Sequence, residues 1–155
     1  MKILIETNQK VTDVAMLLLR IMTGLILFVA GAGKVMGWFG GLGMETTLQL
    51  FKTNMNLSAF WCYVSCYTEF IGGLLVMIGL LTRPAAIALV INMLVATLLV
   101  GFKNFFLGGA PFPALLMVIL LVIALAGPMA YSIDALLVSR TRTDQANSLK
   151  FSTAF

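Results

Sequence analysis

The sequence contains no histidine, and this absence excludes several kinds of site. A Ser-His-Asp triad, a zinc site with imidazole ligands and a His-ligated haem all need that side chain. Cysteine is nearly as scarce, because Cys62 and Cys66 are the only two. Their four-residue spacing on a helix suits a disulfide poorly, so we expect two free, buried thiols. We expect no protein-bound metal and no covalently bound cofactor.

Charged residues are also scarce, at 10% of the 155 residues. Apolar residues make up 61%, and the mean hydropathy is +1.04. Soluble domains have about 45–50% apolar and about 25% charged residues. This composition excludes a disordered chain, a nucleic-acid-binding module and a typical cytosolic enzyme. The first partner that it predicts is therefore the lipid bilayer.

Four apolar segments are long enough to cross a membrane, since about 20 helical residues span a core about 30 Å thick. They cover residues 14–36, 58–81, 85–102 and 112–133. The predicted fold class is all-α, an integral membrane bundle of four transmembrane helices. It occupies residues 13–137, between an N-terminal segment (1–12) and a polar C-terminal tail (138–155).

Two sequence features predict how these helices are joined and oriented. Pro84 ends a tight turn between the second and third spans, and Gly127-Pro128 is expected to bend the end of the fourth. Positive residues favour the cytoplasmic side. With both termini in the cytoplasm, six lie inside and three outside, which favours this orientation for a multi-pass membrane protein. The inner six are Lys2, Lys10, Arg83, Arg140, Arg142 and Lys150, and the outer three are Lys34, Lys52 and Lys103.

The loop between the first two spans carries a helical pattern of its own. Met44, Leu48, Phe51 and Met55 follow one another at spacings of four, three and four residues. Such spacing places them on one face of a helix. We therefore expect a short amphipathic helix at the membrane interface.

Four polar residues lie within or at the ends of the spans, where charges are costly and usually face the bundle. They are Arg20, Lys34, Glu69 and Asn92. Counting residues from the span ends favours an Arg20–Glu69 ion pair with Asn92 as a further donor. The alternative pairs Lys34 with Glu69 while Arg20 extends toward the inner surface. Either arrangement could fasten the helices together or form a polar pocket for a ligand.

Several motifs together resemble those of the DoxX family of small bacterial membrane proteins. The resemblance covers about residues 13–137 and includes Leu18-Leu19-Arg20, the run from Gly31 to Gly43, the run from Glu69 to Arg83, and the last helix ending. The polar positions that match are Arg20, Lys34, Glu69 and Arg83. Further motif positions are Gly31, Gly40, Gly41, Gly72, Gly73, Thr82, Tyr131 and Asp134.

The resemblance implies a four-helix, multi-pass protein of the bacterial inner membrane but no single activity. Some similar proteins are membrane subunits of a thiosulfate:quinone oxidoreductase, and others are linked to redox defence. Many relatives have a histidine where this chain has Ala30, and the chain also lacks a later His and Glu of the family. This departure gives weight to an accessory role.

Two classes of function remain. The first is an accessory or membrane subunit of a redox system, with a quinone near Arg20, Glu69 and Asn92. It needs a redox partner protein, because this chain lacks a Cys or His ligand set for an electron-transfer cofactor. The second is a non-enzymatic scaffold, assembly factor or small-molecule carrier. A homo-oligomer is compatible with both, whereas a lone catalytic enzyme is the least favoured hypothesis.

Overall fold

The computed structural model describes residues 9–100, 111–127 and 132–135, and within these ranges it is all-α. Its elements are α1 (Gln9–Met36), the 3-10 helix η2 (Trp38–Gly40), α2 (Gly43–Met55), α3 (Ala59–Ile78), α4 (Thr82–Val100) and α5 (Pro111–Ala126). The predicted all-α membrane bundle is confirmed. Tyr131, residues 101–102 of the third span, residues 128–131 of the fourth and the tail 138–155 lie outside the described residues.

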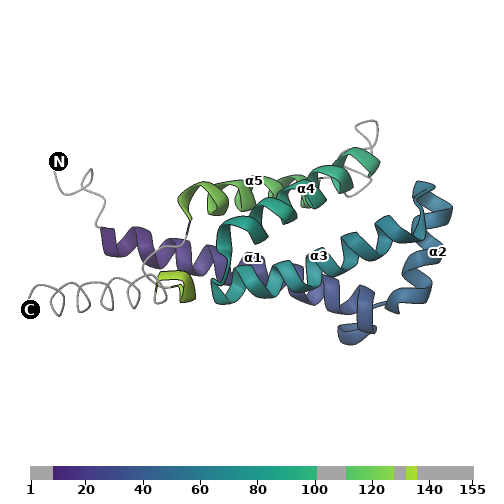
Figure 1. Ribbon diagram of the computed structural model, residues 1–155, viewed down its shortest axis with the longest axis horizontal. Helices are drawn as coiled ribbons and strands as arrows, with labels where there is room; N and C mark the ends of the chain where they lie inside the picture. The colour runs from purple at the N-terminus through teal and green to yellow at the C-terminus, as the bar shows by residue number, and fades with distance from the viewer. Residues whose placement is uncertain (1–8, 101–110, 128–131, 136–155) are drawn as a thin grey trace, which may run out of the picture.

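The long helices form two antiparallel pairs, α1 with α3 and α4 with α5, as Figure 1 shows. The hairpin between α3 and α4 joins the pairs, and α2 lies across the end where α1 stops and α3 starts. The helices α1, α3 and α4 are each long and apolar enough to cross a membrane, whereas α5 is shorter, at 16 residues.

Glycines set the close packing of α1 against α3. A Cβ atom on Gly24 would lie 2.6 Å from the backbone nitrogen of Met77, and one on Gly73 would lie 2.5 Å from that of Phe28. A Cβ on Gly31 would likewise overlap the backbone of α3. Small residues allow helix backbones to approach in this way. These contacts fix the sliding position of one helix along the other.

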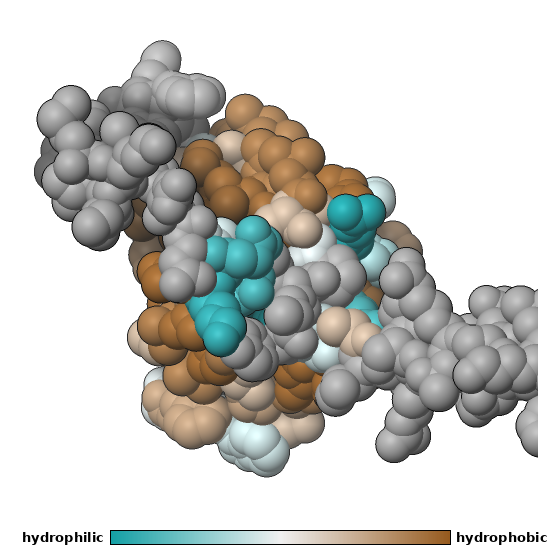
Figure 2. Space-filling model, turned by 90° about the vertical axis from the view of Figure 1, so that its left-hand side faces the viewer, coloured by the Kyte–Doolittle hydropathy of each residue, from teal (hydrophilic) through white to brown (hydrophobic). Residues whose placement is uncertain are grey.

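Large apolar side chains form the centre of the bundle and also cover its outside. Leu27, Leu89 and Leu120 are fully buried, yet Phe60 and Leu125 are 65% and 74% exposed. Figure 2 shows hydrophobic flanks around a hydrophilic patch at the end of the bundle opposite α2. Exposed apolar flanks with polar groups at an end suit a protein surrounded by lipid.

Two predicted local features have different outcomes. The amphipathic helix is confirmed as α2, and its apolar residues Met44 and Phe51 are less exposed than Glu45 and Gln49. The predicted bend at Gly127 is wrong, because α5 ends at Ala126. Gly127 adopts a left-handed conformation (φ 72°) and its N–H donates to the Ile123 carbonyl, as at many helix C-termini.

Replacing Gly73 by alanine tests the close packing. Helix propensity alone would make this change stabilising, but the new methyl group would overlap the α1 backbone. We expect Gly73→Ala to lower the free energy of unfolding by about 1–3 kcal/mol, measured by unfolding in detergent. Gly72→Ala is the matched control, because the three heavy atoms nearest to its methyl group belong to the side chain of Leu89 and not to a helix backbone. Equal effects of the two substitutions would contradict the proposed packing.

Candidate functional site

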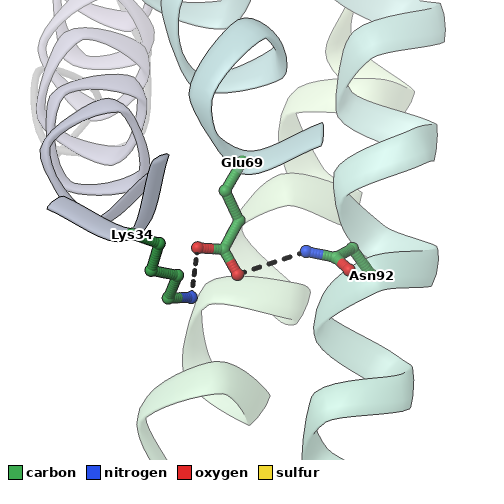
Figure 3. A network of polar contacts seen from close by, with 3 residues as sticks. All are labelled: Lys34, Glu69 and Asn92. Atoms are coloured by element: carbon green, nitrogen blue, oxygen red, sulfur yellow. Dashed lines mark hydrogen bonds and ion pairs between the residues drawn. The ribbon is translucent and has the colours of Figure 1, made fainter. Parts of the chain in front are cut away.

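A buried carboxylate joins three helices near the middle of α3. Glu69 is only 4% exposed. Its Oε2 lies 2.5 Å from Nζ of Lys34 on α1, and its Oε1 accepts a hydrogen bond of 3.3 Å from Nδ2 of Asn92 on α4 (Figure 3). A buried charge is tolerated when it is paired and hydrogen-bonded, so these two partners account for the placement of Glu69. We call Lys34, Glu69 and Asn92 the polar triad.

The helix packing explains why these residues meet. Gly24 of α1 lies against Met77 of α3, and Gly31 lies against Phe70. Gly31 also lies against the backbone of Glu69. Lys34 is three residues further along, in the last turn of α1, and its long side chain reaches the Glu69 carboxylate. The α3–α4 hairpin then brings Asn92 to the other carboxylate oxygen.

The Arg20–Glu69 pair favoured by residue counting is wrong. A Cβ atom on Gly79 would lie 2.8 Å from Cζ of Arg20, so this guanidinium lies at the C-terminal end of α3. Gly79 is ten residues beyond Glu69, or about 15 Å along a helix. Glu69 is paired with Lys34, as in the alternative arrangement. Arg20 itself is 4% exposed and interacts electrostatically with Asp134.

A second polar cluster closes the end of the bundle opposite α2. Asp134 accepts hydrogen bonds from the N–H groups of Leu81 and Thr82, at 2.8 and 2.9 Å, and from the Thr82 hydroxyl at 2.9 Å. The first N–H groups of a helix have no partner within it, so this carboxylate caps α4. The N–H of Asp134 donates in turn to the Gly79 carbonyl.

The guanidinium groups of Arg20 and Arg83 lie at the C-terminal ends of two helices. Arg20 lies against Gly79 at the end of α3, and the guanidinium of Arg83 lies against Gly127 at the end of α5. Positive charge is favourable at a helix C-terminus, where the last carbonyl groups carry partial negative charge. Thr82, Arg83 and Asp134 therefore have a structural role at this end of the bundle, separate from the polar triad.

A large cavity reaches the polar triad between α2, α3 and α4. Its volume is about 610 Å³, within the usual range for small-molecule sites. Lys34, Glu69 and Asn92 form part of its wall, together with the hydroxyl-bearing Ser65 and Thr68. The remaining lining is apolar: Phe51, Met55, Leu57, Trp61, Val64, Ala88, Ile91, Val95, Ala96 and Leu99.

Two smaller hollows also reach Lys34. One, of about 190 Å³, is lined by Leu27, Met93 and Phe112 among others and touches Glu69 from the side of α1 and α5. The other, of about 340 Å³, lies beside Trp38 and Thr47. Lys34 thus lines all three of these hollows while it keeps its ion pair with Glu69.

The cavity lining from α2 and the first half of α3 was not predicted from the sequence. Phe51 and Met55 belong to the apolar face of α2, and that pattern alone does not distinguish a lid over a site from a packing surface. Cys62 and Cys66 are free thiols and fully buried, as predicted.

Comparison with known families agrees with this arrangement. The DoxX family model matches residues 15–102, which include most of α1, all of α2, α3 and α4, and the whole polar triad. The chain belongs to the DoxX family. No solved structure matches this DoxX protein.

Two curated relatives are similar over most of their length. One is the Bacillus subtilis (strain 168) protein named "Putative oxidoreductase CatD", 36% identical over 122 residues, which are 79% of this chain and 86% of the relative. The other is the Escherichia coli (strain K12) protein named "Inner membrane protein YqjF", 30% identical over 141 residues, which are 83% of this chain and 96% of the relative.

A double-mutant cycle tests the pairing within the triad of this DoxX protein. Each single change, Lys34→Gln or Glu69→Gln, leaves a part-buried partner without its counter-charge. We expect unfolding in detergent to give a coupling free energy of about 1–3 kcal/mol for this pair. Arg20→Gln with Glu69→Gln is the matched control, and we expect these two effects to add. Coupling in the control cycle, or its absence in the first, would contradict the structure.

The cap on α4 predicts a pH dependence of stability. Burial alone raises the pKa of Asp134. Hydrogen bonds from the Thr82 and Leu81 N–H groups and the Thr82 hydroxyl, together with the charge of Arg20, lower this pKa by more than burial raises it, so the net shift is downward. The ionised carboxylate therefore stabilises the fold fully above the ordinary pKa of about 3.9. This stabilisation is lost as the pH falls from the ordinary pKa of an aspartate through the lower pKa of Asp134 in the folded state.

We therefore expect the wild type to unfold at a higher temperature than Asp134→Asn at pH 7. The difference between them should shrink as the pH is lowered below about 4. Thermal unfolding in detergent over a pH series measures this. A difference that stays constant across the series would show that ionisation of Asp134 does not contribute.

Proposed function

We propose that this DoxX protein is an inner-membrane subunit of a redox system, that both of its termini are cytoplasmic, and that it binds a quinone or quinol in the large cavity. The observation that carries the proposal is the cavity itself: a mostly apolar hollow with one polar wall made by Lys34, Glu69 and Asn92. The names of the two curated relatives support the redox link and the inner-membrane location.

The lining matches the chemistry of such a ligand. A quinone has an apolar ring and tail and two carbonyl oxygens. The Lys34 ammonium has three N–H donors, and Glu69 takes one, so the others can donate to a carbonyl. The Asn92 amide oxygen can accept from a quinol hydroxyl. Trp61, Ile91 and Val95 are apolar contacts for the ring and tail.

A partner protein completes this proposal. A bound quinone carries electrons and protons between membrane proteins. The chain has no histidine and two cysteines, which is not a ligand set for haem or an iron–sulfur cluster. A partner would therefore carry the electron-transfer cofactor, and this chain would bind and position the quinone.

Tryptophan fluorescence offers a direct test, because Trp61 lines the large cavity and Trp38 lines another hollow. With Trp38→Phe, Trp61 is the sole tryptophan reporter. We expect decylbenzoquinone to quench it saturably in lipid nanodiscs. Ala88→Leu places extra volume in the cavity from an exposed position on α4. It should weaken binding at least about tenfold, or ~1.4 kcal/mol.

The variant Trp61→Phe, which keeps only Trp38, is the matched control for quinone dissolved in the surrounding lipid. Saturable quenching should be specific to Trp61. Linear, non-saturating quenching of equal strength in both variants, unchanged by Ala88→Leu, would refute quinone binding in this cavity.

A further inference from the structure

We infer that the polar triad makes this cavity select an uncharged polar head group and reject an anionic one. The inference rests on the proposed function, and it goes further by naming the property of the ligand that the site distinguishes. Its basis is the charge balance at the cavity wall. Of the described residues that line the cavity, only Lys34 and Glu69 are charged, and they form an ion pair of 2.5 Å.

The depth of Glu69 makes this ion pair hard to separate. The side chain of Glu69 is 5% exposed, whereas that of Lys34 is 33% exposed. An anionic ligand that formed its own ion pair with Lys34 would leave the buried carboxylate of Glu69 with the Asn92 amide as its remaining partner among the polar triad. Removing one partner of a buried ion pair is strongly unfavourable. An anion that left the pair intact would instead lie close to the negative charge of Glu69.

An uncharged carbonyl or hydroxyl group avoids both penalties. The N–H groups of Lys34 that Glu69 does not use can donate to a carbonyl, and the Asn92 amide oxygen can accept from a hydroxyl. The ion pair and the hydrogen bond from Asn92 to Glu69 remain in place (Figure 3). Binding such a head group therefore exposes no unpaired charge.

This selection matters because of what surrounds the protein. A lone lysine in an apolar cavity would attract the anionic head groups and fatty acids of a bacterial membrane. The carboxylate of Glu69 removes that attraction. Specificity of this kind comes from a group that disfavours the wrong ligand, not only from contacts with the right one. Glu69 is thus a specificity-determining residue in this proposal.

The experiment compares two competitors that share a phenyl ring and a decyl chain and differ in the head group. One is 4-decylphenol, uncharged at pH 7, and the other is 4-decylbenzenesulfonate, which is always ionised. Each competes with decylbenzoquinone for the cavity, with saturable quenching of Trp61 in the Trp38→Phe background as the readout. In the wild-type triad we expect the phenol to compete at least about tenfold better than the sulfonate.

Glu69→Gln should change this preference, because it leaves Lys34 as an uncompensated cation while the glutamine can still accept from Asn92. We expect sulfonate competition to strengthen relative to phenol competition by at least about tenfold. The double variant Lys34→Gln, Glu69→Gln is the matched control. Its cavity wall carries neither of the two charges, so the sulfonate should again compete poorly.

Equal competition by phenol and sulfonate in the wild-type triad would overturn the inference while leaving quinone binding intact. Quenching that does not saturate at all would overturn the proposed function, and with it this inference. The wild-type comparison decides the inference even when a triad variant does not fold. When Glu69→Gln folds and binds the quinone, sulfonate competition that is unchanged relative to phenol competition also contradicts the role given to Glu69.

Discussion

The structure depends on the pairing of one carboxylate that is buried in an apolar bundle. Removed from water, Glu69 needs a counter-charge and hydrogen-bond donors, and it obtains them from Lys34 of α1 and Asn92 of α4. One side chain thereby links three helices. The same requirement places polar groups beside a large apolar hollow, so stability and the candidate site share one set of residues. A second polar cluster, at the end of the bundle opposite α2, caps α4.

The close packing of α1 against α3 is what allows this polar triad to form. Contacts at Gly24, Gly31 and Gly73 bring the two backbones together and set their alignment. A side chain at any of these positions would separate the helices or shift one along the other. Lys34 would then meet a different part of α3. In this family member, the glycines therefore influence the site through the position of one helix against the other.

Most of the fold could be predicted from the sequence, because long apolar segments and helical periodicity are local properties. The helix α2 follows from four apolar residues at regular spacing. The ion pair could not be chosen in the same way, because depth counted from span limits ignores how two helices slide past each other. Helix α1 begins at Gln9, five residues before the predicted span, and Arg20 lies beside Gly79. The cavity depends on the angles among three helices, and these angles cannot be predicted from a local sequence pattern.

The cap on α4 has a consequence for the order of events during synthesis. The backbone N–H groups of Leu81 and Thr82 are satisfied by Asp134, about 50 residues later in the chain. Helices emerge from the ribosome in sequence order. When α4 first forms, its N-terminal end therefore has water or lipid head groups as partners. The native cap forms only after α5 has been made and has folded back, so the completion of this bundle is a late step of its biogenesis.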